Sequence, residues 1–184
     1  MNKIYLLVSV LLLAACQKKQ EEKSVVKINP DTVSTDNKVA KLPATSFSES
    51  DLAKKWLTQN IEDNFKTPDG LIDKICTKTY AEYKSDAIGV DYDGGLTPKA
   101  FEKKWKGKFD IKYAGTGTGF LISGQDWVKI KVSKCELSAA KLEEGYLFAT
   151  TIEDIGATSK TVYKRDIKVI PTGNSFLISD VLEY

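Results

Sequence analysis

The sequence contains no histidine, and Arg165 is its only arginine among 27 basic residues. Without imidazole the chain cannot form a Ser-His-Asp or Cys-His catalytic site, or a metal site that depends on histidine ligands. Acid–base catalysis would have to use carboxylates, lysines or tyrosines. Phosphate and guanine recognition favours the guanidinium fork, so one arginine and a net charge of +2 argue against nucleic-acid binding. We expect no metal and no cofactor.

Long hydrophobic runs are also missing, apart from the segment Ile4 to Ala15 that follows Lys3. A helix that crosses a membrane permanently needs about 20 apolar residues, so this run is too short. An early positive charge, a short apolar run and small residues before a cleavage point are typical of a secretory signal. The sequence therefore predicts an exported protein.

The end of this run, Leu13-Ala14-Ala15-Cys16, resembles the bacterial lipobox at every position. The resemblance implies that residues 1–15 are a lipoprotein signal peptide and that Cys16 receives a diacylglycerol and becomes the first mature residue. Two or more acyl chains, such as palmitate, would anchor the protein stably in a membrane. Gln17, in place of Asp, favours the outer membrane in the sorting pattern that this resembles, and leaves the periplasmic or surface face open.

Residues 16–47 are rich in Lys, Glu, Ser, Thr, Asn and Asp and have no sustained apolar period. This composition predicts a flexible tether after the lipidated cysteine. The remaining residues, 48–184, can bury one sizeable core, so we expect a single domain there.

The first part of this domain has helical spacing of apolar residues. Ser48 and Ser50 are candidate caps for a helix that ends near Phe65. A second helix is predicted from Leu71 to Tyr83, after a turn signature at Thr67-Pro68-Asp69-Gly70. Thr97-Pro98 predicts the start of a short third helix that carries Phe101 and Trp105.

After Phe109 the apolar residues alternate, which predicts strands. The predicted strands are Ile111–Ala114, Phe120–Ser123, Trp127–Cys135, Tyr146–Ile155, Thr161–Ile170 and Phe176–Tyr184. Turn-rich breaks at 156–159 and 171–174 favour antiparallel hairpins. Helices followed by an antiparallel meander predict an α+β fold.

Two short motifs add a resemblance to a family. Gly124-Gln125-Asp126-Trp127 and Phe176-Leu177-Ile178-Ser179-Asp180-Val181 are similar to motifs in lipoprotein domains of the nuclear-transport-factor-2-like superfamily. The resemblance covers roughly residues 48–184. It implies a curved, cone-like sheet wrapped around the N-terminal helices, often with a pocket inside.

The two motifs contain the candidate site acids, Asp126 and Asp180. Superfamily enzymes such as steroid isomerases use a pocket carboxylate as a base, so a pocket role is one alternative for each. In the other alternative, Asp126 caps a turn and Asp180 pairs with a lysine or a backbone amide. Gly115-Thr116-Gly117-Thr118-Gly119 has no following Gly-Lys-Ser/Thr and opens no predicted helix, so it indicates a hairpin or bulge and no phosphate loop.

Cys76 and Cys135 remain once Cys16 is lipidated. An even pair in an exported chain favours a disulfide, whereas a place on an apolar helix face favours Cys76 as a packing residue. Cys135 has the same parity as the lysines of its strand, unless a bulge shifts it. Both alternatives stay open from the sequence.

The function predicted from these observations is a membrane-anchored domain that binds a small ligand or an envelope protein without catalysis. The alternative is a carboxylate-dependent enzyme of the same cone fold, of isomerase or hydrolase type, acting on a small hydrophobic molecule. A shielded pocket that holds an acid with a raised pKa beside a hydrogen-bond donor would favour the enzyme.

Overall fold

The computed structural model describes residues 48–67, 72–138 and 144–184. Helix α1 (Glu49–Asn64) begins at Ser48, whose side chain accepts a hydrogen bond from the Asp51 amide while the Asp51 carboxylate accepts one from the Ser48 amide. This capping box satisfies two free amides at the start of the helix. One face of α1 carries fully buried Ala53, Leu57 and Ile61. The predicted first helix is confirmed.

The predicted second helix is wrong as a continuous element. It is divided into α2 (Ile72–Ile75) and α3 (Lys78–Ile88). Cys76 leaves the helical path to form a parallel β-bridge with Ile178, and the Thr77 amide donates to the Ile178 carbonyl at 2.8 Å. Thr77 then caps α3. A long-range backbone contact therefore overrides the local helical spacing.

The predicted third helix is confirmed as α4 (Pro98–Trp105), which Thr97 caps by accepting from the Ala100 amide. Aromatic rings join α4 to α3. The Tyr83 ring stacks on Phe101 at 5.5 Å and on Phe109 at 4.1 Å between ring centroids. Tyr83 and Trp105 are each 1% exposed, so these aromatic side chains are core. None of the described helices is long and apolar enough to cross a membrane.

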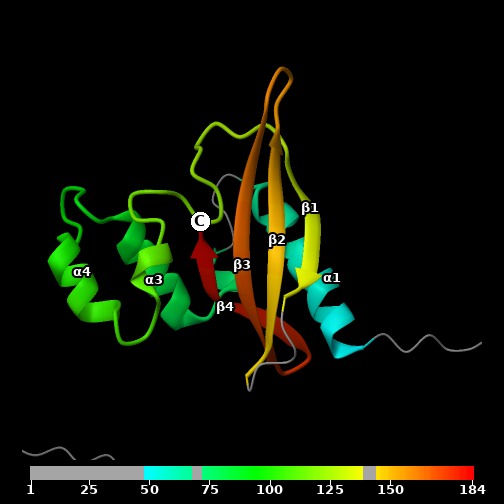
Figure 1. The fold of residues 1–184 in the computed structure, drawn as a ribbon, viewed down its shortest axis with the longest axis horizontal. Helices are drawn as coiled ribbons and strands as arrows, with labels where there is room; N and C mark the ends of the chain where they lie inside the picture. The colour runs from blue at the N-terminus through cyan, green and yellow to red at the C-terminus, as the bar shows by residue number, and fades with distance from the viewer. Residues whose placement is uncertain (1–47, 68–71, 139–143) are drawn as a thin grey trace, which may run out of the picture. The chain divides into compact units, whose positions relative to one another are not determined.

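The chain ends in a four-stranded antiparallel sheet in the order β1-β2-β3-β4. Its strands are β1 (Ile130–Leu137), β2 (Tyr146–Ile155), β3 (Lys160–Thr172) and β4 (Ser175–Glu183). The sheet is open, because β1 and β4 do not pair with each other. Figure 1 shows α1 behind β1 and β2, with α3 and α4 on the side of β4. The predicted α+β order and both hairpins are confirmed.

Two of the six predicted strands are wrong. Ile111–Tyr113 is the 3₁₀ helix η1, capped by Asp110, and 120–123 is an irregular segment. In that segment Leu121 has φ 66° and is fully buried, and Ile122 beside it is 2% exposed. Consecutive burial and a left-handed residue are incompatible with a regular strand.

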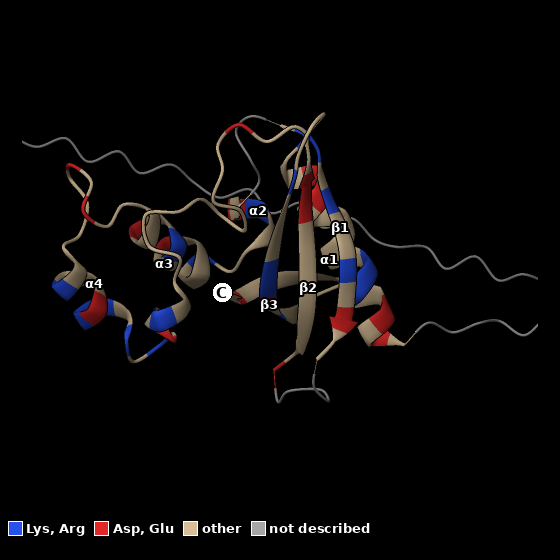
Figure 2. Cartoon of the chain, turned by 45° about the horizontal axis from the view of Figure 1, so that its top comes forward, with Lys and Arg blue, Asp and Glu red and all other residues tan. Residues whose placement is uncertain are grey.

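One face of the sheet forms the core with α1 and the loop before β1. Its buried side chains include Phe148, Ile152, Ile167, Val169, Ile178 and Val181. Figure 2 shows basic and acidic residues interspersed along β1 and α4.

Candidate functional site

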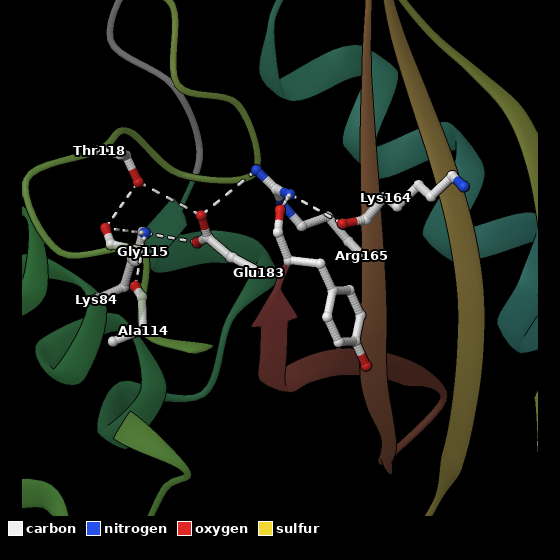
Figure 3. A network of polar contacts seen from close by, with 8 residues as sticks. Lys84, Ala114, Gly115, Thr118, Lys164, Arg165 and Glu183 are labelled. Atoms are coloured by element: carbon white, nitrogen blue, oxygen red, sulfur yellow. Dashed lines mark hydrogen bonds and ion pairs between the residues drawn. The ribbon is translucent and has the colours of Figure 1, made fainter. Parts of the chain in front are cut away.

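The candidate site is a cluster of three charged side chains buried where α3 meets the end of β4 and the middle of β3. It comprises Lys84, Arg165 and Glu183, and Figure 3 shows Lys84 and Arg165 converging on Glu183. Their side chains are 0%, 5% and 4% exposed. Charged groups are almost never this deeply buried unless they are paired.

Lys84 comes from the apolar face of α3, one turn after Tyr80. Its Nζ atom donates to Glu183 Oε1 at 2.5 Å and to the carbonyls of Ala114 and Gly115 at 3.1 and 3.2 Å. An ammonium has three donors, so all of them are used. Lys84 therefore links the loop after η1 to β4 through hydrogen bonds.

Arg165 and Glu183 are cross-strand partners in the β3–β4 register. Arg165 follows the alternation of Ile167 and Val169, so it points to the core face. Glu183 reaches that face because β4 carries an irregularity: Val169 pairs with Ile178, but Lys168 pairs with Asp180, so Ser179 is an extra residue. A bulge of one residue reverses the alternation beyond it.

The Arg165 guanidinium has several partners. Nη1 donates to the Lys164 carbonyl at 2.9 Å and lies 3.5 Å from the Tyr184 backbone oxygen, and Nη2 lies 3.5 Å from Glu183 Oε2. Nε is buried and has no hydrogen-bond partner among the described residues. The guanidinium lies over the Tyr163 ring at 5.5 Å.

The burial of the cluster controls its protonation. Loss of solvent lowers the pKa of Lys84 and of Arg165 and raises the pKa of Glu183, while the attraction between opposite charges acts against each shift. Arginine stays charged at neutral pH. With Lys84 and Glu183 ionised, two positive charges and one negative charge share this water-poor region.

The glycine run Gly115-Thr116-Gly117-Thr118-Gly119 also borders the site. Gly115 has φ 57°, and a Cβ atom built on it would lie 2.3 Å from Glu183 Oε2. Only glycine fits this combination of left-handed backbone and close approach. Thr118 donates to the Gly115 carbonyl at 2.7 Å and lies 3.5 Å from Glu183 Oε2. The run forms a tight turn, and no helix begins after it.

An open cleft of about 320 Å³ lies beside the cluster. Its lining consists of Gly115, Thr118, Ser123, Val162, Tyr163, Lys164, Arg165, Glu183 and Tyr184. A neighbouring cleft of about 260 Å³ shares Lys164, Arg165 and Tyr184 with it. Two basic residues, Lys164 and Arg165, thus border both clefts.

A further cleft, of about 480 Å³, lies along α2 and α3. It contains Glu82 and Asp86, but Lys104 pairs with both of them, at 2.8 and 2.7 Å. No group of three or more acidic or cysteine side chains in 48–67, 72–138 and 144–184 could hold a metal ion.

The structure does not bring the predicted acids together at one site. Asp126 is exposed in the irregular segment before β1. Asp180 is half-buried on β4, opposite Lys168, and lines a cleft with residues 106–111. Burial raises the pKa of Asp180, while the Val181 amide and Lys168 act to lower it. These two neighbours are the partners that the second alternative for Asp180 named.

The two cysteines lie at opposite edges of the sheet, and both are free thiols. Cys76 bridges to Ile178 on β4, whereas Cys135 pairs with Thr150 from edge strand β1. A disulfide needs Cα atoms within about 7 Å. Strands β2 and β3 lie between the two edges, and each pair of neighbouring strands is about 4.8 Å apart, so the two edges are too far apart for this bond. A bulge at Ser133 reverses the alternation of β1 and turns Cys135 to the buried face, which is the exception that the sequence prediction allowed for. Cys16 lies outside the described residues.

Sequence analysis did not identify the ion cluster, although two signals pointed to it. Lys84 occupies an apolar helix position, and the sole arginine shares the parity of Ile167 and Val169. A charged residue at a core position predicts a buried partner. Nothing local identified Glu183 as that partner, since it is 99 positions from Lys84.

Comparison with known proteins gives no relatives. No family, no curated protein and no solved structure matches this chain.

Proposed function

We propose that this protein is a bacterial lipoprotein, held on a membrane through lipid on Cys16, and that its α+β domain binds a small ligand or an envelope protein without catalysis. The support for the anchor is the sequence Leu13-Ala14-Ala15-Cys16 after a short apolar run. Gln17 favours the outer membrane. Residues 16–47 would then act as the tether that holds the domain away from the lipid.

Metabolic labelling with palmitate tests the anchor. Wild-type protein should incorporate the label, and Cys16→Ser should lose it and accumulate as an uncleaved precursor. Cys76→Ser and Cys135→Ser are matched controls that should label normally, because their thiols are buried in the domain. Labelling of the Cys16→Ser protein would refute the anchor.

The binding role of the domain is supported by how its buried acid is used. Glu183 is the more deeply buried of two acids whose pKa is raised by burial, the other being Asp180, and Lys84 and Arg165 engage both oxygens of Glu183. A general base needs a free oxygen that can reach a substrate proton. The clefts beside the cluster are open to solvent, which suits recognition of another molecule more than chemistry in a shielded pocket.

The same residue is the reason to keep the enzyme as a second candidate. Glu183 borders a cleft, and its pKa is raised by burial. In that case a carboxylate-dependent enzyme would act on a small hydrophobic molecule. The curved cone of the nuclear-transport-factor-2-like superfamily suits either candidate, and the order of helices before an antiparallel sheet packed on α1 supports it.

Native mass spectrometry and cross-linking test the binding role. Protein purified from envelopes should carry a bound small molecule or cross-link to a partner, and Tyr163→Ala in the cleft should reduce either one. Lys103→Ala, on α4 and outside this cleft, is the matched control. If no bound molecule or partner depends on Tyr163, the proposed binding role fails. Turnover of a small hydrophobic substrate that Glu183→Gln abolishes would favour the enzyme.

A further inference from the structure

The outer edge of strand β1 carries backbone groups that no described strand pairs with. Figure 1 shows β1 as the last strand of the sheet on the side of α1. The Ser138 amide donates to the Leu147 carbonyl of β2. In an antiparallel ladder alternate residues point their amides and carbonyls to opposite sides, so those of Cys135 and Leu137 face the free edge. These groups are available to another extended backbone.

The preceding part of the same edge is closed by the chain itself. The Val132 amide also faces the free edge, and it donates to the Glu62 carboxylate of α1 at 3.0 Å. The bulge at Ser133 interrupts the ladder after Val132. Proteins protect sheet edges by such means, because open edges pair with other chains. The open part, Lys134 to Leu137, is short and has room for one added strand segment.

A groove lies beside this open part, between α1 and β1. Its volume is about 360 Å³, and its lining consists of Lys54, Thr58, Val132, Ser133, Lys134, Cys135 and Glu136. Leu137 has the same parity as the buried Cys135, so it faces the α1 side, and it is 45% exposed. An apolar side chain of an added strand would contact Leu137 beside this groove.

Two copies of β1 are poor partners for each other. The antiparallel register that uses the edge groups of both Cys135 and Leu137 places Glu136 opposite Glu136 of the second copy, and like charges directly opposite are destabilising. A register centred on Cys135 places Leu137 opposite the bulge at Ser133. The open edge therefore favours a different chain.

The exposed face of β1 determines which charges that chain should carry. Lys134 and Glu136 lie on this face and form an exposed ion pair at 2.9 Å. An antiparallel strand complements them when it has a basic residue opposite Glu136 and an acidic residue opposite Lys134. The residues that alternate with these two would face the α1 side, where Leu137 favours apolar side chains.

We propose that the edge of β1 from Lys134 to Leu137 binds an extended segment of another protein, which adds to the sheet as an antiparallel strand with the residue order apolar, basic, apolar, acidic. The groove beside this edge shares no lining residue with the cleft of about 320 Å³ next to Arg165. The inference is therefore a second binding surface, beyond the function proposed for that cleft.

A synthetic peptide tests the strand addition on the full lipidated chain, labelled with ¹⁵N and held in detergent micelles. The acetylated and amidated peptide Thr-Val-Lys-Val-Glu-Thr should shift the Cys135 and Leu137 amide resonances in a saturable way and slow their hydrogen exchange. The same peptide with both valines N-methylated lacks two donors and should bind about tenfold more weakly or less. No saturable shift, or equal binding of the methylated peptide, would overturn the proposal.

A peptide of the same composition tests the charge order. Thr-Val-Glu-Val-Lys-Thr places like charges opposite Glu136 and Lys134, and should bind about threefold more weakly or less. Equal affinity of the two peptides would overturn the proposed order.

The variant Leu137→Pro tests the edge from the side of the chain. Proline is tolerated on an edge strand where its missing amide faces away from the ladder, and here it should weaken peptide binding by about fivefold. Leu137→Ala keeps the amide and should weaken binding less, whereas equal losses would refute a role for that amide. If Leu137→Pro does not fold, the N-methylated peptide tests the same hydrogen bonds.

The two proposals fail separately. Tyr163→Ala should reduce binding in the cleft and leave the affinity for the peptide unchanged, and Leu137→Pro should do the reverse. Loss of peptide binding in Tyr163→Ala would overturn the site on β1.

Discussion

Substitution of Glu183 by Gln should destabilise the domain strongly. The change keeps the shape of the side chain but removes the carboxylate that Lys84 and Arg165 share, and the side chains of these two residues are 0% and 5% exposed. Breaking a buried ion pair by removing one partner costs roughly 3–5 kcal/mol, because the remaining charge stays buried and uncompensated. Here two positive charges would remain, so we expect a value in this range.

Urea unfolding followed by tryptophan fluorescence measures this loss, since Trp105 is buried in the same domain. The expected fall in Tm is roughly 10–15 °C for a domain of this size. Glu102→Gln is the control, because its pair with Lys106 is exposed to solvent, and it should change stability little. A loss of less than about 1 kcal/mol for Glu183→Gln would refute the reasoning.

A double-mutant cycle gives an independent check on the same pair. Lys84→Met removes a buried charge and keeps an unbranched side chain. Combined with Glu183→Gln, it should cost less than the sum of the two single changes, because each single variant leaves a partner unpaired. Strictly additive losses would show that the two side chains do not interact across their 2.5 Å contact.

Three further results are expected. Cys76 and Cys135 should resist a thiol reagent in the folded protein, because burial raises the pKa of each thiol, and both should react in denaturant. Thiols that react in denaturant only after a reductant is added would show a disulfide and contradict this. Tyr80 and Tyr83 have phenol pKa values raised by burial, so their contribution to stability is complete below the unfolded value of 10.0 and is lost as pH rises through the folded values. Absorbance at 295 nm should therefore report these two ionisations together with loss of the circular dichroism signal, and ionisation of all tyrosines in a folded chain would contradict it. Ser48→Ala should cost about 1 kcal/mol through loss of the α1 cap, measured by urea unfolding, and no loss would mean that the cap is not formed in solution.

The prediction of the fold succeeded where local chemistry decides the outcome. Thr97-Pro98 and Ser48 start helices because they satisfy free amides, and the turn-rich segments at 156–159 and 171–174 join antiparallel strands. It failed where a distant contact intervened. The contacts of Cys76 and Thr77 with Ile178 interrupt the helix, and no feature of the local sequence predicts these contacts.

The candidate site depended even more on tertiary structure. The sequence by itself determined that this chain has no histidine chemistry and that its one guanidinium belongs to Arg165. It could not determine which side of the sheet Glu183 faces, because one extra residue at Ser179 reverses the alternation of β4. Only the paired strands place that carboxylate beside Arg165 and, across 99 positions, beside Lys84. Spacing along the chain fixes local periods, whereas the register between strands depends on packing of the whole core.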